Sequence, residues 1–507
     1  MNSGGFRFQS ARGNQTATAL LIALALAVWL VRGPATTLWW TSWGPDQPWA
    51  HRDLLGALWL WSAEAHEGTA HWLTLQNHPD GAPDIRHHIP NPFDAWLFGP
   101  LLGLIGGSVR SWWGAVQLAH HLGNISATVG LSRTLGARWY SAAAAGVVVA
   151  ATPVMLHEVA GGRGLSGAVW PGLWALALAV RGRGLHAGFL VGLQGLFYLY
   201  TGALVGLIAL LLRPSLGLLS GASLVLLPYL AWLSPLLDGL NGRPPPADYS
   251  ILPLASLWGD TDLPARQRLS PWCWIGLLAA IVTRRWRWAV ASGLAIVIAL
   301  GPTPGAKTEA AVVASPLAWL MVWIPALGRM HHPVRAILLA VPVMAAIGAR
   351  AWPRMAVLAA LGALLGGAAM QDAAAWGEAR SRTGMAQALW LAEHADGAVL
   401  DLTGAGAEAL ALQPIHQRPM LEGLRKPMGP TGAGYLRKRA DGWLSGQPQP
   451  GLDRELAEAG FTHVLVLDRQ GTGITQAHDA VHAALGPPVY PSVYAVPILP
   501  SPSAPAP

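Results

Sequence analysis

The sequence has little cysteine and little charge. Its one cysteine, Cys273, can form no intrachain disulfide and excludes a metal cluster of several thiolates. Charged residues make up 12% of the chain, against about 25% in soluble domains, whereas hydrophobic residues make up 52%. This balance excludes an ordinary soluble domain. It predicts a polytopic α-helical protein of the inner, cytoplasmic membrane type.

Tryptophan dominates the aromatic residues, with 26 Trp against 8 Tyr and 7 Phe. Trp is favoured at the headgroup level of a bilayer, because its ring is half apolar and half polar. The net charge is +7, and most of it comes from arginines that stand beside apolar runs. In a soluble protein this charge would suggest nucleic acid. Here we interpret it as a topology signal and expect no nucleic-acid partner.

Eleven apolar runs predict about eleven transmembrane helices. Arg7 and Arg12 precede the first run, so the positive-inside rule places the N-terminus in the cytoplasm. With strict alternation, the short arginine-bearing connections also lie on the cytoplasmic side. The runs near 269–283 and 288–301 are shorter than the roughly twenty residues that span a bilayer. The runs are 18–31, 112–132, 139–157, 166–180, 186–199, 201–212, 215–235, 269–283, 288–301, 334–349 and 353–370.

Two further stretches complete the membrane part, residues 1–371. The long connection 35–111 is predicted as the first outer loop. Within it, the apolar stretch 93–107 is interpreted as a helix along the outer face; if it crosses the membrane instead, the later orientations invert.

The pattern changes from residue 372 onward, where the chain is predicted to lie outside the cytoplasm. Apolar alternation over 398–402 and 462–467 predicts β-strands. Polar helical patterns separate them, so residues 372–498 are predicted to form a small extracytoplasmic α/β domain. The Pro-rich tail 499–507 is expected to be disordered. The helical patterns lie near 380–394, 432–444, 452–460 and 475–485.

Three segments together carry a resemblance to a known family. They are Asp53 with Gly56, Trp59 and Pro79-Asp80-Gly81; His157-Glu158-Val159-Ala160-Gly161-Gly162 before Trp170-Pro171; and Arg329-Met330-His331-His332-Pro333-Val334-Arg335 ahead of an apolar run. In this layout the chain resembles the GT-C superfamily of integral-membrane glycosyltransferases, which use polyprenyl-phosphate-linked sugars as donors. It looks most like the poorly characterised bacterial members with a C-terminal extracytoplasmic α/β domain. Typical members carry paired acids after the first span, whereas Arg52 precedes Asp53 here, so a divalent metal is left open.

The resemblance implies a catalytic acid in the outer loop. Sugar transfer from a lipid phosphate to a hydroxyl needs a base for the proton and cations for the departing phosphate. Asp53 is the expected base; alternatively it is the N-cap of a helix over 54–59. Asp46 competes for the role, although its place between two prolines also fits a simple turn residue. Glu158 is the second candidate acid, and its alternative is a solvated helix end.

The candidate substrate-binding residues are cationic, acidic and aromatic. Arginine offers a planar fork that matches phosphate oxygens, although a basic side chain at a membrane edge is also commonly a lipid anchor. Asp80 and Asp84 flank Gly81 and could line a path for the acceptor. Tyr198 and Tyr200 fit either sugar stacking or an aromatic belt. The full set is Arg329, His331, His332, Arg335, Asp80 and Tyr200.

Histidines and several short motifs are interpreted conservatively. Six of the 17 histidines fall in the outer loop, but their irregular spacing does not predict a zinc site. His120 and His121 lie inside a span, where they either face a cavity or pack against Asn124. Gly404-Ala405-Gly406 lacks the third glycine of a dinucleotide loop, and Ser166 is no nucleophile elbow. Arg437-Lys438-Arg439 is interpreted as the solvated face of a helix.

Together with the topology, the resemblance implies a glycosyltransferase that acts at the outer face of the membrane on hexosyl or pentosyl groups. Its expected partners are a lipid-linked sugar donor, the membrane, and a saccharide, lipid or protein acceptor. The alternative is a non-catalytic membrane protein that binds or carries a lipid-linked saccharide. A transporter is disfavoured, because the sequence shows no inverted repeat and no matching pair of broken spans.

Overall fold

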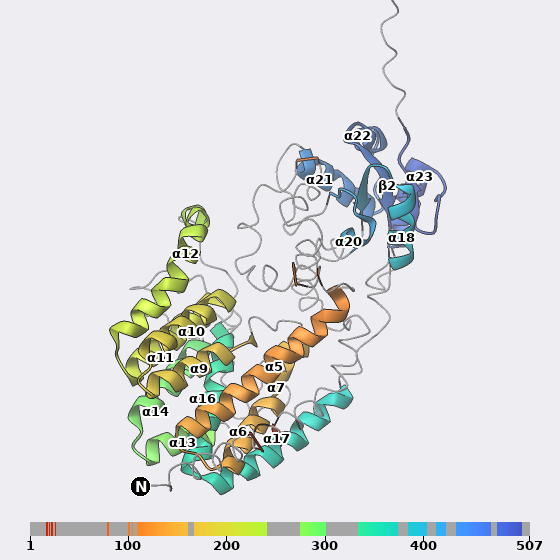
Figure 1. Ribbon diagram of the computed structural model, residues 1–507. Helices are drawn as coiled ribbons and strands as arrows, with labels where there is room; N and C mark the ends of the chain where they lie inside the picture. Colours follow the sequence, from red (N-terminus) through yellow and green to blue (C-terminus); the bar gives the residue numbers. More distant parts are fainter. Residues whose placement is uncertain are drawn as a thin grey trace, which may run out of the picture. The chain divides into compact units, whose positions relative to one another are not determined.

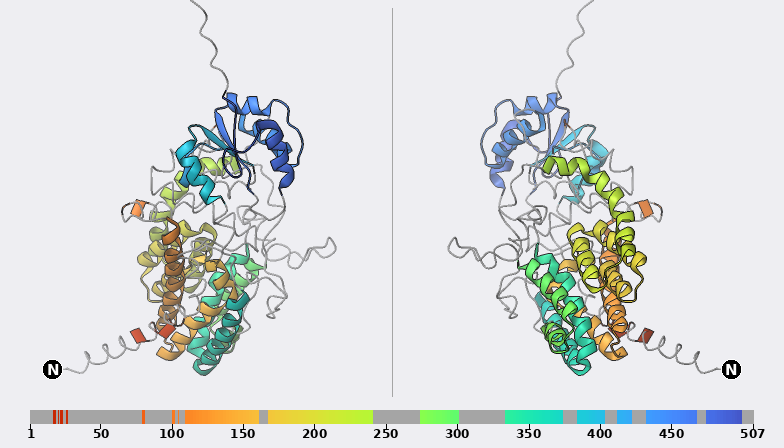
Figure 2. Two further views of the ribbon diagram at one scale, coloured as in Figure 1. Left: turned by 90° about the vertical axis from the view of Figure 1, so that its right-hand side faces the viewer. Right: turned by 90° about the vertical axis from the view of Figure 1, so that its left-hand side faces the viewer.

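The chain divides into two compact units (Figures 1 and 2). The first comprises residues 1–36 and 114–375, and the second comprises 37–113 and 376–507. The first outer loop is therefore grouped with the C-terminal part of the chain, whereas the sequence prediction assigns it to the membrane domain. The computed structural model describes residues 17, 18, 20, 22, 23, 26, 79, 80, 100, 101, 104, 109–160, 167–240, 274–300, 333–373, 384–402, 412–421, 432–467 and 474–498.

The first unit is helical. Its core is built from small and branched apolar side chains, and α6 is buried from Ser141 to Ala151. Large apolar side chains also point outward, among them Leu216, Leu224 and Leu365. Such outward apolar surface suits a helix bundle surrounded by lipid. The helices are α5 (Val109–Thr134), α6 (Trp139–Ala151), α7 (Pro153–Ala160), α9 (Trp170–Val180), α10 (Gly184–Phe197), α11 (Leu199–Leu212), α12 (Leu216–Leu240), α13 (Trp274–Val282), α14 (Trp286–Ala299), η6 (Pro333–Ala336), α16 (Ile337–Ala351) and α17 (Pro353–Ala373).

Each apolar run after the first coincides with helix in the described residues, but the helices differ in length from the predicted spans. The run 139–157 is two helices, because Thr152 is extended and Pro153 starts a new helix instead of continuing the old one. Among the described residues, one helix, Pro333–Ala351, is long and apolar enough to cross a membrane. The number of eleven spans therefore stays a prediction. Of the stretch 93–107, the structure describes Pro100, Leu101 and Leu104, which are helical.

Arginines of the short connections bind backbone carbonyls. The last carbonyls of an α-helix have no partner within the helix, and a basic side chain can satisfy them. Arg213 donates to Val180 O (3.4 Å) at the end of α9, and Arg287 donates to Leu212 O (2.8 Å) at the end of α11. Arg133 and Arg350 instead bind the backbone of the connection between α5 and α6, at Ala137 O (2.6 Å) and Leu135 O (3.1 Å). These arginines therefore have a structural role beside the one predicted for them in topology.

The second unit contains a three-stranded sheet in the order β1-β2-β3. Strand β1 (Ala398–Asp401) pairs in parallel with β2 (Phe461–Leu465), and β2 pairs antiparallel with β3 (Val493–Ala495). Parallel neighbours need a crossover, and α21 (Gly432–Leu444) and α22 (Leu452–Glu458) lie in the connection between them. The other helices are α18 (Met385–His394), α20 (Gln413–His416) and α23 (Thr475–Leu485).

The predicted strands and the four predicted helical patterns of this part coincide with β1, β2, α18, α21, α22 and α23. Strand β3 and the single turn α20 were not predicted, since three or four residues between prolines carry no readable period. Trp443 is completely buried in the core of this unit.

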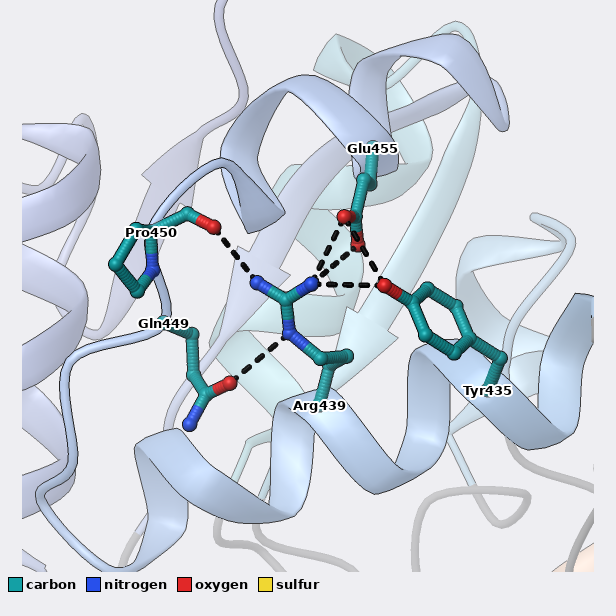
Figure 3. A network of polar contacts seen from close by, with 5 residues as sticks. All are labelled: Tyr435, Arg439, Gln449, Pro450 and Glu455. Atoms are coloured by element: carbon teal, nitrogen blue, oxygen red, sulfur yellow. Dashed lines mark hydrogen bonds and ion pairs between the residues drawn. The ribbon is translucent and has the colours of Figure 1, made fainter. Parts of the chain in front are cut away.

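The prediction that Arg437-Lys438-Arg439 is a solvated helix face is wrong for both arginines. Arg437 is buried and donates to Asp441 over 2.9 Å. The Arg439 guanidinium lies inside a closed network, in which it donates to both oxygens of Glu455 at 2.8 and 3.1 Å (Figure 3). It also donates to Tyr435 Oη, Gln449 Oε1 and Pro450 O. Arg439 thus joins α21 to α22.

Candidate functional site

A buried acid and an arginine meet in the first unit. Glu158 lies near the end of α7 and is 5% exposed, so the alternative of a solvated helix end is wrong. Arg335 lies in the short 3-10 helix η6, which Pro333 begins directly ahead of α16. Its Nε lies 3.9 Å from Glu158 Oε2. The second and third segments of the family resemblance are therefore brought together.

A tyrosine adds a third element to this pair. The guanidinium carbon of Arg335 lies 5.2 Å from the centre of the Tyr198 ring, within the range of a cation–π contact. Tyr198 is extended between α10 and α11, and its ring meets the Tyr200 ring edge-on at 5.8 Å. Arg335 thus contacts protein groups rather than extending toward lipid headgroups. The acid, the cation and the aromatic ring come from three separate parts of the chain.

Two buried amide side chains hold the segment that follows Glu158. Asn124 of α5 donates to Gly167 O and accepts from Val169 N, both at 2.8 Å. Gln194 of α10 donates to Ala168 O at 2.9 Å and accepts from Gly172 N at 3.1 Å. The first N–H groups of a helix have no partner within it, and these amides supply acceptors at the start of α9. This explains how Asn and Gln can be buried here.

Glycine at position 167 allows this segment to lie against the acid. A Cβ atom added to Gly167 would be 2.9 Å from Glu158 Cβ, closer than real Cβ contacts allow. Asn124 holds the carbonyl of the same glycine. The backbone at Gly167 therefore helps to fix the position of the Glu158 Cβ atom.

His120 packs among aromatic rings. Trp170 Nε1 donates to His120 Nδ1 at 3.3 Å, and Phe197 meets the His120 ring edge-on at 5.5 Å. His120 and His121 are both buried. One prediction was that these histidines pack against Asn124. The Asn124 amide binds the backbone of residues 167 and 169, and these bonds set its orientation.

Asp80 lies in the second unit and has a structural partner. Its Oδ2 accepts from Ala433 N at 2.8 Å, at the start of α21. Gly432 has φ +56°, and a Cβ atom there would collide with the Asp80 carboxylate. A carboxylate at a helix N-terminus satisfies an unpaired N–H and interacts favourably with the helix dipole. Its predicted contact with substrate stays a prediction.

The remaining candidates lie outside the residues that the structure describes, so their convergence with Glu158 stays a prediction. Within the described residues, no group of three or more His, Cys, Asp or Glu side chains could hold a metal ion. Whether a divalent metal binds near the first outer loop therefore stays open. These candidates are Asp46, Asp53, Asp84, Arg329, His331 and His332.

The sequence analysis did not identify Asn124 and Gln194 as organising residues. The signal was present, because an amide inside an apolar span is costly unless its donors and acceptors are matched. The partners could not be inferred, since they are backbone groups 22 to 45 residues away.

No protein-family model and no curated protein matches this chain. Among solved structures, the chain is similar to the cryo-EM structure of the arabinofuranosyltransferase AftD from Mycobacteria, with a TM-score of 0.54 and 19% identity over 93% of this chain. It is also similar to the crystal structure of an Archaeoglobus fulgidus oligosaccharyltransferase, with a TM-score of 0.46 and 15% identity over 88% of this chain and 67% of that chain. The chain spans 37% of the AftD chain. At these identities the likeness is one of fold alone.

Proposed function

We propose that this protein is a membrane glycosyltransferase that moves a sugar from a polyprenyl-phosphate-linked donor to an acceptor at the outer face of the cytoplasmic membrane. The observation that carries the proposal is the meeting of Glu158, Arg335 and Tyr198. The similar AftD protein is described as an arabinofuranosyltransferase. Transfer of a pentosyl group is accordingly the first possibility to test, and a hexosyl group the second.

Arg335 is the proposed ligand of the donor phosphate. A guanidinium presents parallel N–H groups that match two phosphate oxygens and remains charged at any physiological pH. The contacts with Glu158 and with the Tyr198 ring restrict its orientation before a donor arrives. This preorganisation lowers the entropic cost of binding. Arg329, His331 and His332, which precede η6 in sequence, are proposed to add positive charge around the same phosphate.

Asp53 is the proposed general base. The acceptor hydroxyl must lose its proton as the glycosidic bond forms, and a carboxylate within hydrogen-bond reach can take it. The bond from the anomeric carbon to the donor phosphate breaks in the same step, and the phosphate leaves as an anion held by Arg335. Asp46 is the proposed substitute for Asp53, whereas Glu158 is proposed to position Arg335. A divalent metal remains open.

The proposed topology places the N-terminus and the arginine-bearing turns in the cytoplasm. The C-terminal α/β part is then extracytoplasmic, where it would help to hold the acceptor. Reporter fusions at Arg183 and near Pro487 should report opposite sides of the membrane. Reports from the same side would contradict both the orientation and the proposed outer-face reaction.

Asp53→Asn tests the chemistry. Asp53→Asn keeps the size of the side chain and an oxygen for capping, so folding should be retained. Loss of the base should lower transfer from a polyprenyl-phosphate sugar by about a hundredfold or more. A folded Asp53→Asn protein with full transfer activity would move the base to Asp46 or Glu158. If substitutions of Asp46 and Glu158 also leave transfer unchanged, the non-catalytic alternative is favoured.

Donor affinity tests Arg335 separately from turnover. Arg335→Lys keeps the charge but loses the fork, so it should bind a polyprenyl-phosphate sugar more weakly than the wild type does. Arg183→Lys is the matched control, because Arg183 is exposed at a helix start away from Glu158 in sequence and has no capping bond. Equal donor affinity of the wild type and Arg335→Lys would remove Arg335 from the phosphate site.

A further inference from the structure

Two histidines lie one turn apart on helix α23 of the second unit. His478 and His482 occupy positions i and i+4 within Thr475–Leu485. Backbone hydrogen bonds keep the helix regular on both sides of the pair, from His478 N to Ile474 O and from Gly486 N to His482 O. Side chains at this spacing stand on the same face of a helix, with their Cβ atoms about 5–6 Å apart.

The pair lies at the border between the buried and the exposed side of α23. Ala477 and Val481, the residues directly before the two histidines, are fully buried in the core of the second unit. His478 is half-buried, and His482 is exposed. Solvent therefore reaches this face of the helix, and so can a dissolved ion.

Each ring uses its Nδ1 atom for a hydrogen bond within the protein. His482 Nδ1 lies 3.0 Å from Gly486 O, and because a carbonyl oxygen can only accept, this nitrogen carries the proton. His478 Nδ1 lies 2.8 Å from Tyr494 Oη, a hydroxyl oxygen that can accept a bond of the same kind. With both Nδ1 atoms donating, each neutral ring presents its lone pair on Nε2.

The two Nε2 atoms have no structural partner. Among the residues that the structure describes, neither of them makes a hydrogen bond. The two nitrogens of an imidazole ring point in different directions. Nε2 of His482 is therefore turned away from Gly486, and Nε2 of His478 is turned away from Tyr494 on β3. The fold thus uses one nitrogen of each ring and leaves the other accessible.

This arrangement is the one in which histidine binds transition metals. A ligating ring usually donates its other N–H group to a carbonyl, a carboxylate or water, which fixes the tautomer and the orientation of the ring. Two histidines four residues apart on one face of a helix are a known zinc-binding spacing. With Zn–N bonds of about 2.0–2.1 Å, one ion can join two imidazoles separated by a single turn. Helix α23 carries no Lys or Arg that would repel the ion.

We propose that His478 and His482 bind a divalent transition-metal ion, with Zn²⁺ as the reference ion, through their Nε2 atoms. Within the described residues, no third histidine, cysteine or acid completes the group, so the other coordination positions are open to water or to an external ligand. Imidazole suits Zn²⁺, Ni²⁺ and Cu²⁺, whereas Mg²⁺ and Ca²⁺ prefer oxygen ligands. The site does not depend on the proposed glycosyl transfer.

Protection of single histidines tests the site in the detergent-purified full-length protein, since 17 histidines make total zinc binding uninformative. Diethyl pyrocarbonate modifies accessible imidazole nitrogens, and peptide mass spectrometry measures the modification of each histidine. Zn²⁺ should protect His478 and His482 over the same range of concentration, and Mg²⁺ at that concentration should protect neither. His482→Gln should raise the Zn²⁺ concentration that half-protects His478 by about tenfold or more.

His186→Gln is the matched control. His186 is exposed on α10, and no second histidine lies within four residues of it. This variant should leave the Zn²⁺ protection of His478 unchanged, and a loss equal to that in His482→Gln would contradict a specific pair.

Three other results would overturn the proposal: absence of Zn²⁺ protection in the wild type, equal protection by Mg²⁺, or protection of His478 in His482→Gln at the wild-type Zn²⁺ concentration. Should His482→Gln fail to fold, the wild type still provides a test. Its Zn²⁺ protection must decrease as the pH is lowered below neutral, because protons compete with the metal for Nε2. Protection that is independent of pH contradicts the site.

Discussion

Replacing Asn124 by Leu removes one of the two amides that hold the start of α9. Leu has nearly the same size but neither donor nor acceptor. The change therefore deletes the bonds to Gly167 O and Val169 N, both of 2.8 Å, without creating a large cavity. Asn124 is 3% exposed, so water has little access to replace either bond. Two backbone groups are left unsatisfied in an apolar environment.

The expected loss of stability follows from these two bonds. A buried polar group that loses its partner costs about 1–3 kcal/mol. Two such groups give about 2–6 kcal/mol, and local relaxation together with the modest strength of side-chain hydrogen bonds in membrane proteins favours the lower half. We expect Asn124→Leu to lower the free energy of unfolding by about 3 kcal/mol. Because Gly167 lies against Glu158, donor binding should weaken as well.

Reversible unfolding by sodium dodecyl sulfate in mixed micelles measures this loss. Thr128→Val is the matched control on the same helix, since Thr128 is equally buried and its hydroxyl bonds only to Asn124 O, one turn earlier. That carbonyl keeps its position in the helix when the hydroxyl is removed, so the control should cost about 1 kcal/mol or less. The reasoning is refuted if Asn124→Leu is as stable as the wild type, or if the control costs as much.

Three further changes concern the second unit. Arg439→Lys should lower its stability by about 1–2 kcal/mol in thermal unfolding, because one ammonium group cannot donate to Gln449 Oε1, Pro450 O and Glu455 as the three separate nitrogens of the guanidinium do; unchanged stability would show that the network is dispensable. Burial lowers the pKa of His463, so the unfolded chain binds a proton more tightly than the folded one does. The contribution of His463 to stability should therefore be complete above about pH 6.5 and decrease as the pH falls toward the folded-state pKa. His463→Gln should flatten that profile, and an unaltered profile would exclude His463 as its source. Gly432→Ala should destabilise α21 by about 1–3 kcal/mol, because φ is +56° and the methyl group meets Asp80; a hydrogen-exchange rate equal to that of the wild type would contradict this.

The positions of most helices could be predicted from the sequence, because long apolar runs leave few alternatives to a helix with satisfied backbone groups. Their ends could not. The run predicted from residue 166 begins as helix at Trp170, where Asn124 and Gln194 bind the preceding backbone. Such ends depend on tertiary hydrogen bonds, which hydropathy does not contain.

The candidate site shows the same division. Glu158 and Arg335 could be singled out, because charged residues are rare in a chain of this composition. The contact of Tyr198 with Arg335 could not be predicted, because it joins residues far apart in the sequence. The network of Arg439 was mispredicted, since its partners on α22 are invisible to the periodicity of α21 itself.

Two arginine–glutamate pairs of the described residues, one in each unit, differ in a way that bears on function. Arg439 binds Glu455 through bonds of 2.8 and 3.1 Å within a closed network, as a structural link would. The Nε of Arg335 lies 3.9 Å from Glu158, at the outer limit of an ion pair, although this pair is the more deeply buried of the two. Burying two charges is costly, and a buried ion pair is by itself weak evidence of a stabilising role, so Arg335 and Glu158 are the better candidates for a functional role. In the proposed site the contacts with Glu158 and Tyr198 orient the guanidinium, and the donor phosphate is its second anionic partner.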